Sequence, residues 1–433
     1  MRILGITEYH CLGDLYWRLK RQGHEVRVSV ADAGSHDIFA GMVERTDDWR
    51  AELQWIKSAG EDGVIVFESA HQGALQDALR LDGYAVVGGC AWGDRIEGDR
   101  QYGQQVLRDA GLQIAASWEF TDYAAALAFL AGHPMRVVYK VCEDWAASTR
   151  NYIGEMDDGS DVAALIALEQ RRAPAGHRPH FILMQHLQGV EIGIGGYFNG
   201  QEFLRPLCLD WEHKRFFPGD LGELTGEMGT LVTYRHYEVL FEQTLAKLAE
   251  PLRQHGYHGY INLNTIINAE GVWPLEFTCR FGYPGFAICD ALHTEGWASI
   301  LKAMATGSQI DIPTRPGYAV GVVLTIPPFP YPSGTEHSAK GIPIFFKPGM
   351  TTAEQAQLHY SEVGLEQGQL VTAGSMGYVM VATGVGADVP TAQRAAYALA
   401  SKVIIPNLRY RHDIADRFLR QDQAQLQRWG YLP

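Results

Sequence analysis

The feature that most constrains the fold is a hairpin pattern at residues 260–278, where two strand-like runs flank a short turn. The turn contains Glu270 and Gly271, and the glycine suits the left-handed position of a three-residue turn. With the register centred on Glu270, one face of the two strands is apolar and consists of Ile261, Leu263, Leu275 and Phe277. An apolar face must be covered, so the pattern predicts an antiparallel sheet that lies on a buried core.

The opposite face of this hairpin is polar. Asn264 is expected directly across from Glu276, and Asn262 across from Thr278, with Cβ atoms about 4.5–5.5 Å apart. Arg280, two residues further on, would share the face. Amide, carboxylate and hydroxyl oxygens are the hard ligands that Mg²⁺ prefers. The pattern by itself also fits a hairpin whose outer face is simply solvated, so a metal site depends on the rest of the chain.

The first hundred residues alternate short apolar runs with helical patterns, as a βαβ sheet domain does. Strands are expected at residues 3–6, 26–30, 64–67 and 85–87, and helices at residues 12–21 and 75–81. The turn after the first strand lacks the GxGxxG phosphate loop, which disfavours dinucleotide binding. His10 is interpreted as a loop residue at the edge where an open sheet presents substrate. Residues 1–97 are predicted to form an N-terminal α/β domain.

Residues 98–312 are predicted to form a second domain of mixed structure. The expected elements are helices at 99–110, 123–130 and 238–254, strands at 136–141, 181–185 and 192–198, and the hairpin. Proline-rich sequence begins at Pro313, which places a domain boundary there. Residues 313–433 then combine strands at 320–326 and 378–383 with an amphipathic helix at 391–404, the pattern of a small α+β domain.

Composition narrows the class of protein. The 433 residues carry a formal net charge of −14 and no Lys/Arg block, which disfavours nucleic-acid binding because phosphate neutralisation needs clustered cations. The six cysteines are scattered without zinc-ligand spacing, so a reduced cytoplasmic protein is expected. The chain shows no signal peptide and no apolar stretch of membrane-spanning length. We expect a monomer or homodimer that acts on small molecules.

Several segments, in this order and spacing, resemble ATP-grasp ligases and most closely phosphoribosylamine–glycine ligase. The similar segments are residues 97–100, 138–140, 187–191, Glu212-His213-Lys214-Arg215, Thr225-Gly226-Glu227-Met228-Gly229, Glu276-Phe277-Thr278-Cys279-Arg280-Phe281-Gly282 and residues 392–413. The resemblance implies an ATP-grasp fold with a Rossmann-like pre-ATP-grasp domain at residues 1–97. The ATP-grasp domain would span residues 98–312 with a lid subdomain at about 119–190, and the small α+β domain would close the chain.

The resemblance also implies how ATP and its metal ion are bound. Arg100 and Lys140 would clamp the phosphates, because transfer of a γ-phosphoryl group needs cations that spread its charge. Asn264, Glu276 and Thr278 would hold Mg²⁺ or Mn²⁺. Each cation has a simpler reading, Arg100 as an ordinary helix residue and Lys140 as a solvated strand end.

The remaining roles concern the nucleoside and the acyl phosphate. Backbone groups would contact the adenine edge from Gln185, His186 and Leu187. Glu191 would bind the ribose hydroxyl groups, although it could instead pair with a neighbouring cation. Arg280 and Lys214 would stabilise the acyl phosphate while an amine attacks it.

Four departures from the family lie around these segments. The loop after the first strand reads Thr7-Glu8-Tyr9-His10 where the family grips the sugar phosphate, and Tyr283-Pro284-Gly285 loses two carboxylates near the expected acceptor. Thr278 replaces the usual asparagine metal ligand, and residues 144–150 lack the glycines of the family's phosphate loop. Ser148, Thr149 or Arg150 would then contact the phosphates instead of backbone amides.

We therefore predict a carboxylate–amine ligase that forms an amide through an acyl phosphate, with an altered acceptor site. One alternative is a genuine phosphoribosylamine–glycine ligase of purine biosynthesis. A second alternative, suggested by Thr278 and the glycine-free loop, is a nucleotide-binding module without turnover.

Overall fold

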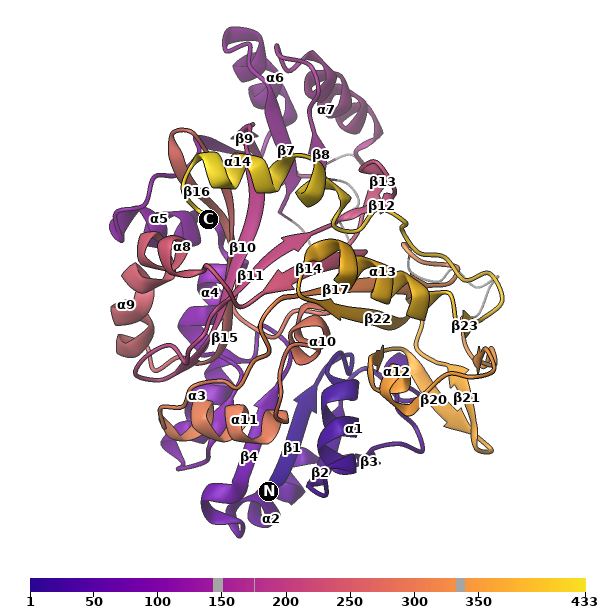
Figure 1. The fold of residues 1–433 in the computed structure, drawn as a ribbon. Coiled ribbons are helices and arrows are strands. Elements are labelled where there is room, and N and C mark those ends of the chain that lie inside the picture. Colours follow the sequence, from indigo (N-terminus) through magenta and orange to yellow (C-terminus); the bar gives the residue numbers. More distant parts are fainter. Residues whose placement is uncertain (143–150, 175, 332–338) are drawn as a thin grey trace.

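The computed structural model describes residues 1–142, 151–174, 176–331 and 339–433. Figure 1 shows three layers along the long axis of the molecule: an N-terminal sheet at one end, a large sheet in the middle, and a small sheet with two helices at the other end. The hypothesis about residues 144–150 lies outside the described residues.

The N-terminal sheet is parallel, and its strand order is β3-β2-β1-β4-β5. Its elements are β1 (Arg2–Thr7), α1 (Gly13–Arg21), β2 (Glu25–Val30), β3 (Glu44–Arg45), α2 (Leu53–Lys57), β4 (Gly63–Phe67), α3 (Gly73–Leu81) and β5 (Val86–Val87). The strand β4 is buried along its whole length, as expected for a strand covered on both faces. The predicted βαβ arrangement is confirmed.

Two short helices lead from this sheet to the far end of the molecule. They are α4 (Ala91–Gly98) and α5 (Arg100–Asp109), and the Asp99 carboxylate caps α5 by accepting from the N–H of Tyr102 at 3.0 Å. The small four-stranded sheet that follows has the order β6-β9-β7-β8. Its elements are β6 (Ser117–Phe120), α6 (Tyr123–Gly132), β7 (Val137–Val141), β8 (Tyr152–Ile153), α7 (Ser160–Arg172) and β9 (Phe181–Gln185). It has a separate hydrophobic core, built around Tyr139, Ile166 and Phe181.

The central sheet has eight strands in the order β16-β15-β10-β11-β14-β17-β22-β19. They are β10 (Val190–Asn199), β11 (Cys208–Glu212), β14 (Gly229–Thr233), β15 (His258–Asn268), β16 (Gly271–Thr278), β17 (Tyr318–Thr325), β19 (Leu358–Tyr360) and β22 (Tyr378–Gly386). Strand β17, which follows Pro313, pairs with β14, which precedes it. The sheet therefore runs without interruption across the predicted boundary at Pro313.

The remaining elements lie around this sheet. They are β12 (Arg215–Phe217), β13 (Leu221–Leu224), α8 (Glu238–Gln243), α9 (Ala249–Gln254), α10 (Gly285–Asp290), α11 (Trp297–Thr306), β18 (Phe345–Phe346), α12 (Thr352–Ala356), β20 (Val363–Glu366), β21 (Gln369–Thr372), α13 (Val389–Ala400), β23 (Val403–Ile404) and α14 (Gln423–Arg428). Among the helices that the structure describes, none has the length and apolar character that crossing a bilayer requires.

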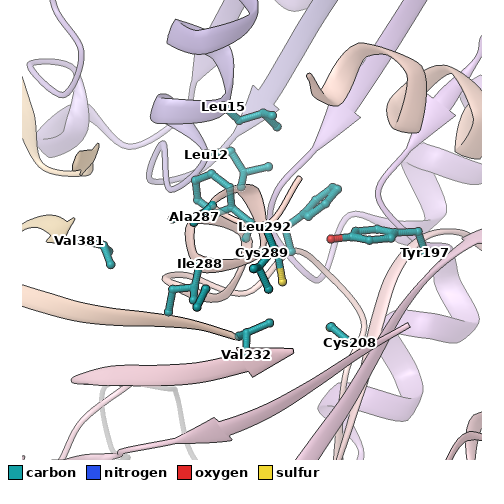
Figure 2. Close-up of a cluster of buried hydrophobic side chains, with 14 of the residues drawn as sticks. Leu12, Leu15, Tyr197, Cys208, Val232, Ala287, Ile288, Cys289, Leu292 and Val381 are labelled. Carbon is teal, nitrogen blue, oxygen red and sulfur yellow. The ribbon is translucent and has the colours of Figure 1, made fainter. Parts of the chain in front are cut away.

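Helix α10 is packed between the N-terminal domain and the central sheet. Figure 2 shows α10 at the centre of a buried cluster, with Leu12 and Leu15 on one side and Val232 and Val381 on the other. Ile288 of α10 is fully buried in this cluster. The start of α1 is thus packed against the segment that follows the hairpin.

The hairpin has the predicted register at the end that carries Asn264 and Glu276, but its turn differs from the predicted one. Asn264 pairs with Glu276 and Asn262 with Thr278, as expected. The turn, however, is a two-residue turn in which Asn268 pairs with Gly271, and the register shifts by one residue between Asn264 and Thr265. A bulge in β16 supplies the residue that the shorter turn omits, and the two deviations cancel.

The bulge overturns one prediction. Leu275 was expected on the core face, but it lies in a small cluster with Ile182 and Met184 of strand β9 in the small sheet. The neighbouring Pro274 has no N–H to donate to a strand ladder, which favours a bulge at this place. The extra residue turns the Leu275 side chain toward β9.

Two helices differ from their predicted extents, one because it is broken and one because it ends earlier. The expected long helix at residues 238–254 is broken into α8, a 3-10 turn at Leu245–Leu248 and α9, because Thr244 leaves helical geometry at φ −130° and ψ −95°. Pro251 also lacks the N–H that a continuous helix would require, and is tolerated here in the first turn of α9. The helix predicted at residues 391–404 ends at Ala400, and Ile404 belongs to β23.

Candidate active site

Three cations surround the carboxylate of Glu276 on the polar face of the hairpin. Its Oε2 atom lies 2.9 Å from Nη1 of Arg100 and 3.7 Å from Nζ of Lys140, and its Oε1 atom lies 3.9 Å from Nζ of Lys214. Arg100 comes from α5 and Lys140 from β7. Lys140, then Arg100 and Lys214, hold the pKa of Glu276 well below its ordinary value against the opposing effect of burial.

Lys214 connects Glu276 to a second group of acids. Its Nζ atom lies 3.2 Å from Oε1 of Glu191 and 3.1 Å from Oε2 of Glu212. Although burial opposes the change, Glu212, Glu191 and Glu276 raise the pKa of Lys214 well above its ordinary value. Asn264 also donates to Glu191, at 2.8 Å. The predicted residues Arg100, Lys140, Glu191, Lys214, Asn264 and Glu276 therefore form one contiguous group.

Two predicted site residues lie at the margin of this group. Thr278 ends β16 opposite Asn262. The Arg280 guanidinium points to another partner, since its Nε atom donates to Glu97 at 3.0 Å, and Glu97 also accepts from the N–H of Cys279 at 2.6 Å. Arg280 is thereby fixed on the side of the N-terminal domain.

The prediction from sequence gave no role to three acids beside Lys214. Asp210 and Glu212 lie on β11, and Glu227 lies in the turn before β14. Burial, and then the neighbouring Glu212, raise the pKa of both Asp210 and Glu227 well above its ordinary value. The signal was present in the alternation of Asp210 and Glu212 on β11, because every second residue of a strand faces the same side.

The oxygen donors near Glu276 fit a hard divalent cation that is also held by substrate phosphates. Among the described residues, no three His, Cys, Asp or Glu side chains group together in a way that could hold a metal ion. Asn264 and Glu276 nevertheless face each other on neighbouring strands. Mg²⁺ characteristically takes one or two carboxylates and completes its shell with water and phosphate oxygens rather than with a closed protein cage.

The predicted adenine segment runs beside an apolar cluster. The N–H of Gln185 donates to the carbonyl of Ala116 at 2.8 Å, and the N–H of His186 to that of Arg136 at 3.1 Å. Among the backbone hydrogen bonds of the described residues, none is donated by the N–H of Leu187. Its side chain packs with Ile182 and Met184 of β9 and with Leu275, which the hairpin bulge brings toward that strand.

His10 lies in the loop between β1 and α1, as predicted, but its side chain is buried rather than solvated. Its Nδ1 atom lies 3.0 Å from the guanidinium of Arg45, and burial, then Arg45, lower its pKa to about 3. Beside it, Glu68 follows β4 and is 4% exposed. Glu68 accepts from Thr7 Oγ1 at 2.8 Å and from the N–H of Leu12 at 3.0 Å. These residues form a buried polar group at the carboxyl ends of β1 and β4.

Burial raises the pKa of Glu68 to about 7, which predicts a pH-dependent cost in stability. A folded-state pKa above the unfolded value means that stability falls as pH rises from about 4.5 to 7 and is not regained above 7. Glu68→Gln keeps the acceptor oxygen and removes the charge. We expect it to raise the free energy of unfolding by about 3 kcal/mol at pH 8 and to change it little at pH 4.5, measured by urea unfolding.

The control for this experiment is Glu61→Gln, at an exposed position near the opposite end of β4. It should leave the urea midpoint unchanged at both pH values. A Glu68→Gln variant with the same gain at pH 4.5 and pH 8 would contradict the assignment of the effect to ionisation.

Comparison with known proteins places this geometry in a family. A model of the phosphoribosylglycinamide synthetase ATP-grasp (A) domain matches residues 98–286, and a model of the C domain of that synthetase matches residues 319–417. The phosphoribosylamine–glycine ligase of Pseudomonas aeruginosa is 26% identical over 436 residues, covering 95% of this chain and 96% of the relative. The ligase of Streptomyces coelicolor is 27% identical over 362 residues, covering 81% and 83%.

Solved structures agree on the fold. The phosphoribosylamine–glycine ligase of Thermotoga maritima superimposes with a TM-score of 0.71 at 22% identity, covering 96% of this chain and 100% of that one. The biotin carboxylase domain of the 2-oxoglutarate carboxylase of Hydrogenobacter thermophilus, solved with MgADP and bicarbonate, gives 0.66 at 11% identity, covering 99% and 98%.

The fold, the two family models and the cation-rich hairpin define an ATP-grasp ligase, an enzyme that forms C–N bonds with release of ADP. Within that class the chain belongs to the phosphoribosylglycinamide synthetase family, with both the ATP-grasp and the C domain of that synthetase. The predicted superfamily and fold are thereby confirmed.

Proposed function

We propose that this ligase uses MgATP to activate a carboxylate as an acyl phosphate and joins it to an amine other than phosphoribosylamine. The observation that carries the proposal is the convergence of Arg100, Lys140 and Lys214 on Glu276. Once a metal ion takes up the Glu276 carboxylate, Arg100 and Lys140 are available to phosphate oxygens, while Lys214 stays paired with Glu191 and Glu212. Preorganised charge of this kind is the main requirement of phosphoryl transfer.

We assign the nucleotide to the space between the lid and the hairpin. Arg100 and Lys140 would hold its phosphates, and Asn264, Glu276 and Thr278 would hold Mg²⁺ or Mn²⁺, which spreads the charge of the transferred group when bound. The adenine ring would lie on the apolar cluster around Leu275, with Leu187 N–H available to its edge. The free oxygen of Glu191 would accept from the ribose.

The acyl phosphate would form between Lys214 and Arg280. Lys214 stands on the nucleotide side, and Arg280, fixed by Glu97, stands on the side of the N-terminal domain. Their charges would stabilise the acyl phosphate and the oxyanion that develops when the amine attacks it. We place the reaction in the cytoplasm of a cell, since the six cysteines are free thiols, and the enzyme as a monomer or homodimer.

The altered acceptor distinguishes this proposal from a genuine phosphoribosylamine–glycine ligase. Expression in a bacterial strain that lacks that ligase should not restore growth without purines, because Thr7-Glu8-Tyr9-His10 and Tyr283 replace the family's acceptor residues. A family ligase expressed from the same vector is the positive control. Growth would establish the purine enzyme instead.

The release of ADP distinguishes the proposed ligase from a nucleotide-binding module without turnover. We expect MgATP-dependent ADP formation when paired amino acids and amines are screened by a coupled assay. Tight nucleotide binding without ADP formation from any pair would favour the module.

A further inference from the structure

The carboxyl ends of β1 and β4 border the place where an open α/β sheet binds ligands. In the order β3-β2-β1-β4-β5, the strands β2 and β3 are added on one side of β1, and β4 and β5 on the other side. The direction of strand addition therefore reverses between β1 and β4, which flank the topological switch point. Ligands of such sheets bind outside the carboxyl ends of the strands at this point. Helix α1 begins there as well, and the free N–H groups of a helix N-terminus attract anions.

In this chain an internal carboxylate already uses these donors. Glu68, the residue after β4, accepts from the N–H of Leu12 at the start of α1 and from the hydroxyl of Thr7 at the end of β1. A second acid, Asp14, lies buried in the first turn of α1 and is paired with Arg18 and His359. Glu68 thus accepts from the start of the helix, and Asp14 adds a second negative charge to its first turn.

The loop between β1 and α1 is closed to a phosphate in a second way. The N–H of His10 donates to Thr7 Oγ1 at 2.8 Å, and that of Gly13 to the carbonyl of His10 at 3.3 Å. The His10 ring packs against Tyr16 and Phe39, with centroids 5.9 and 5.3 Å apart. No glycine lies between Thr7 and Gly13, so side chains keep an incoming anion away from the backbone.

The nearby arginines are also engaged. Arg45 donates to the carbonyl of Ile38 and contacts His10, and Arg280 pairs with Glu97. Leu12, just before α1, lies beside α10, the helix that follows Arg280 in the chain (Figure 2). The loop is therefore on the side of the proposed acyl phosphate that Arg280 borders.

We infer that the acceptor amine of this ligase carries no phosphate group, because Glu68 occupies the anion position at the switch point of the N-terminal sheet. The inference rests on the proposed ligase function and names the class of its amine substrate. A phosphorylated amine would have to displace a buried carboxylate from its hydrogen bonds and approach its charge, whereas an unphosphorylated amine meets neither obstacle.

The test measures binding of a phosphate-bearing probe apart from turnover. Ribose 5-phosphate is titrated calorimetrically at pH 8 into the full-length protein with MgADP present, so that the predicted nucleotide site is filled. We expect no binding by the wild type up to about 10 mM, and binding at least about tenfold tighter by Glu68→Ala, which frees the donors of Thr7 and Leu12. Glu61→Ala, an exposed change near the other end of β4, should behave as the wild type.

Submillimolar binding by the wild type, or equal affinities in the wild type and Glu68→Ala, would overturn the inference. If Glu68→Ala does not fold, Glu68→Gln removes the charge with little change in volume, and the same comparison applies to it. In the wild type, ethanolamine against phosphoethanolamine and serine against phosphoserine form matched pairs for ADP release. Preference for the phosphorylated members also overturns the inference, whereas absence of ADP release from every pair counts against the ligase function and leaves the calorimetric result unaffected.

Discussion

Glu276→Gln is expected to lower the rate of MgATP-dependent ADP formation by about 10³-fold, which corresponds to roughly 4 kcal/mol of transition-state stabilisation. The change removes one negative charge from the proposed metal site and almost no volume. It also leaves Arg100, Lys140 and Lys214 without the carboxylate on which they converge. The rate is measured by coupled ADP detection with the best substrate pair from the screen.

The matched control is Glu270→Gln at the tip of the same hairpin. Glu270 is exposed in the turn, so the same change of charge there should leave the rate within about twofold of the wild type. Circular dichroism should show both variants folded, because the Glu276 side chain is 35% exposed and its loss opens no core cavity. A fully active Glu276→Gln protein would remove the basis for the metal site.

Lys214→Met is expected to reduce both stability and activity. The Lys214 side chain is 28% exposed, and its ammonium group contacts Glu191 and Glu212 and lies near Glu276. Methionine would remove this cation from Glu191 and Glu212, whereas Glu276 would keep Arg100 and Lys140. Removing one partner of a largely buried ion pair costs about 4 kcal/mol in the free energy of unfolding. We also expect ADP formation to fall by at least about 10²-fold, because a cation beside the acyl phosphate is lost.

The loss of stability in Lys214→Met should depend on pH, and the direction of this dependence can be checked. Burial alone would raise the pKa of Glu191, but Lys214 and Asn264 hold it below its ordinary value. The stability that Lys214 gives to Glu191 is therefore present above the unfolded pKa of about 4.3 and is lost as pH falls through the lower folded value. The difference between wild type and Lys214→Met should shrink below about pH 4.

Lys302→Met is the control for Lys214→Met. Lys302 forms an exposed pair with Asp62, and such a pair contributes little to stability. Its loss should leave the urea midpoint and the ADP rate unchanged. A Lys214→Met variant as stable as this control would show that the acids around Lys214 do not depend on it.

The candidate site could be predicted in part because its central residues lie on regular strands. Asn264 and Glu276 are opposed by the period of the hairpin. Asp210 and Glu212 share a face of β11 by the same rule, but the prediction from sequence gave them no role. Glu68 had no comparable signal. Its contacts with Thr7 and Leu12 join residues 56 to 61 positions apart, and they exist because parallel strands bring their carboxyl ends together.

The sequence by itself determined the strand and helix pattern of the N-terminal sheet, the polar face of the hairpin and the family to which the chain belongs. These depend on periodicity and on local motif order, which are written in neighbouring residues. The tertiary structure decided the bulge that turns Leu275 toward β9, the continuous sheet across Pro313 and the carboxylate at the start of α1. Each of these arises from contacts between distant segments, where packing and hydrogen-bond geometry outweigh local preference.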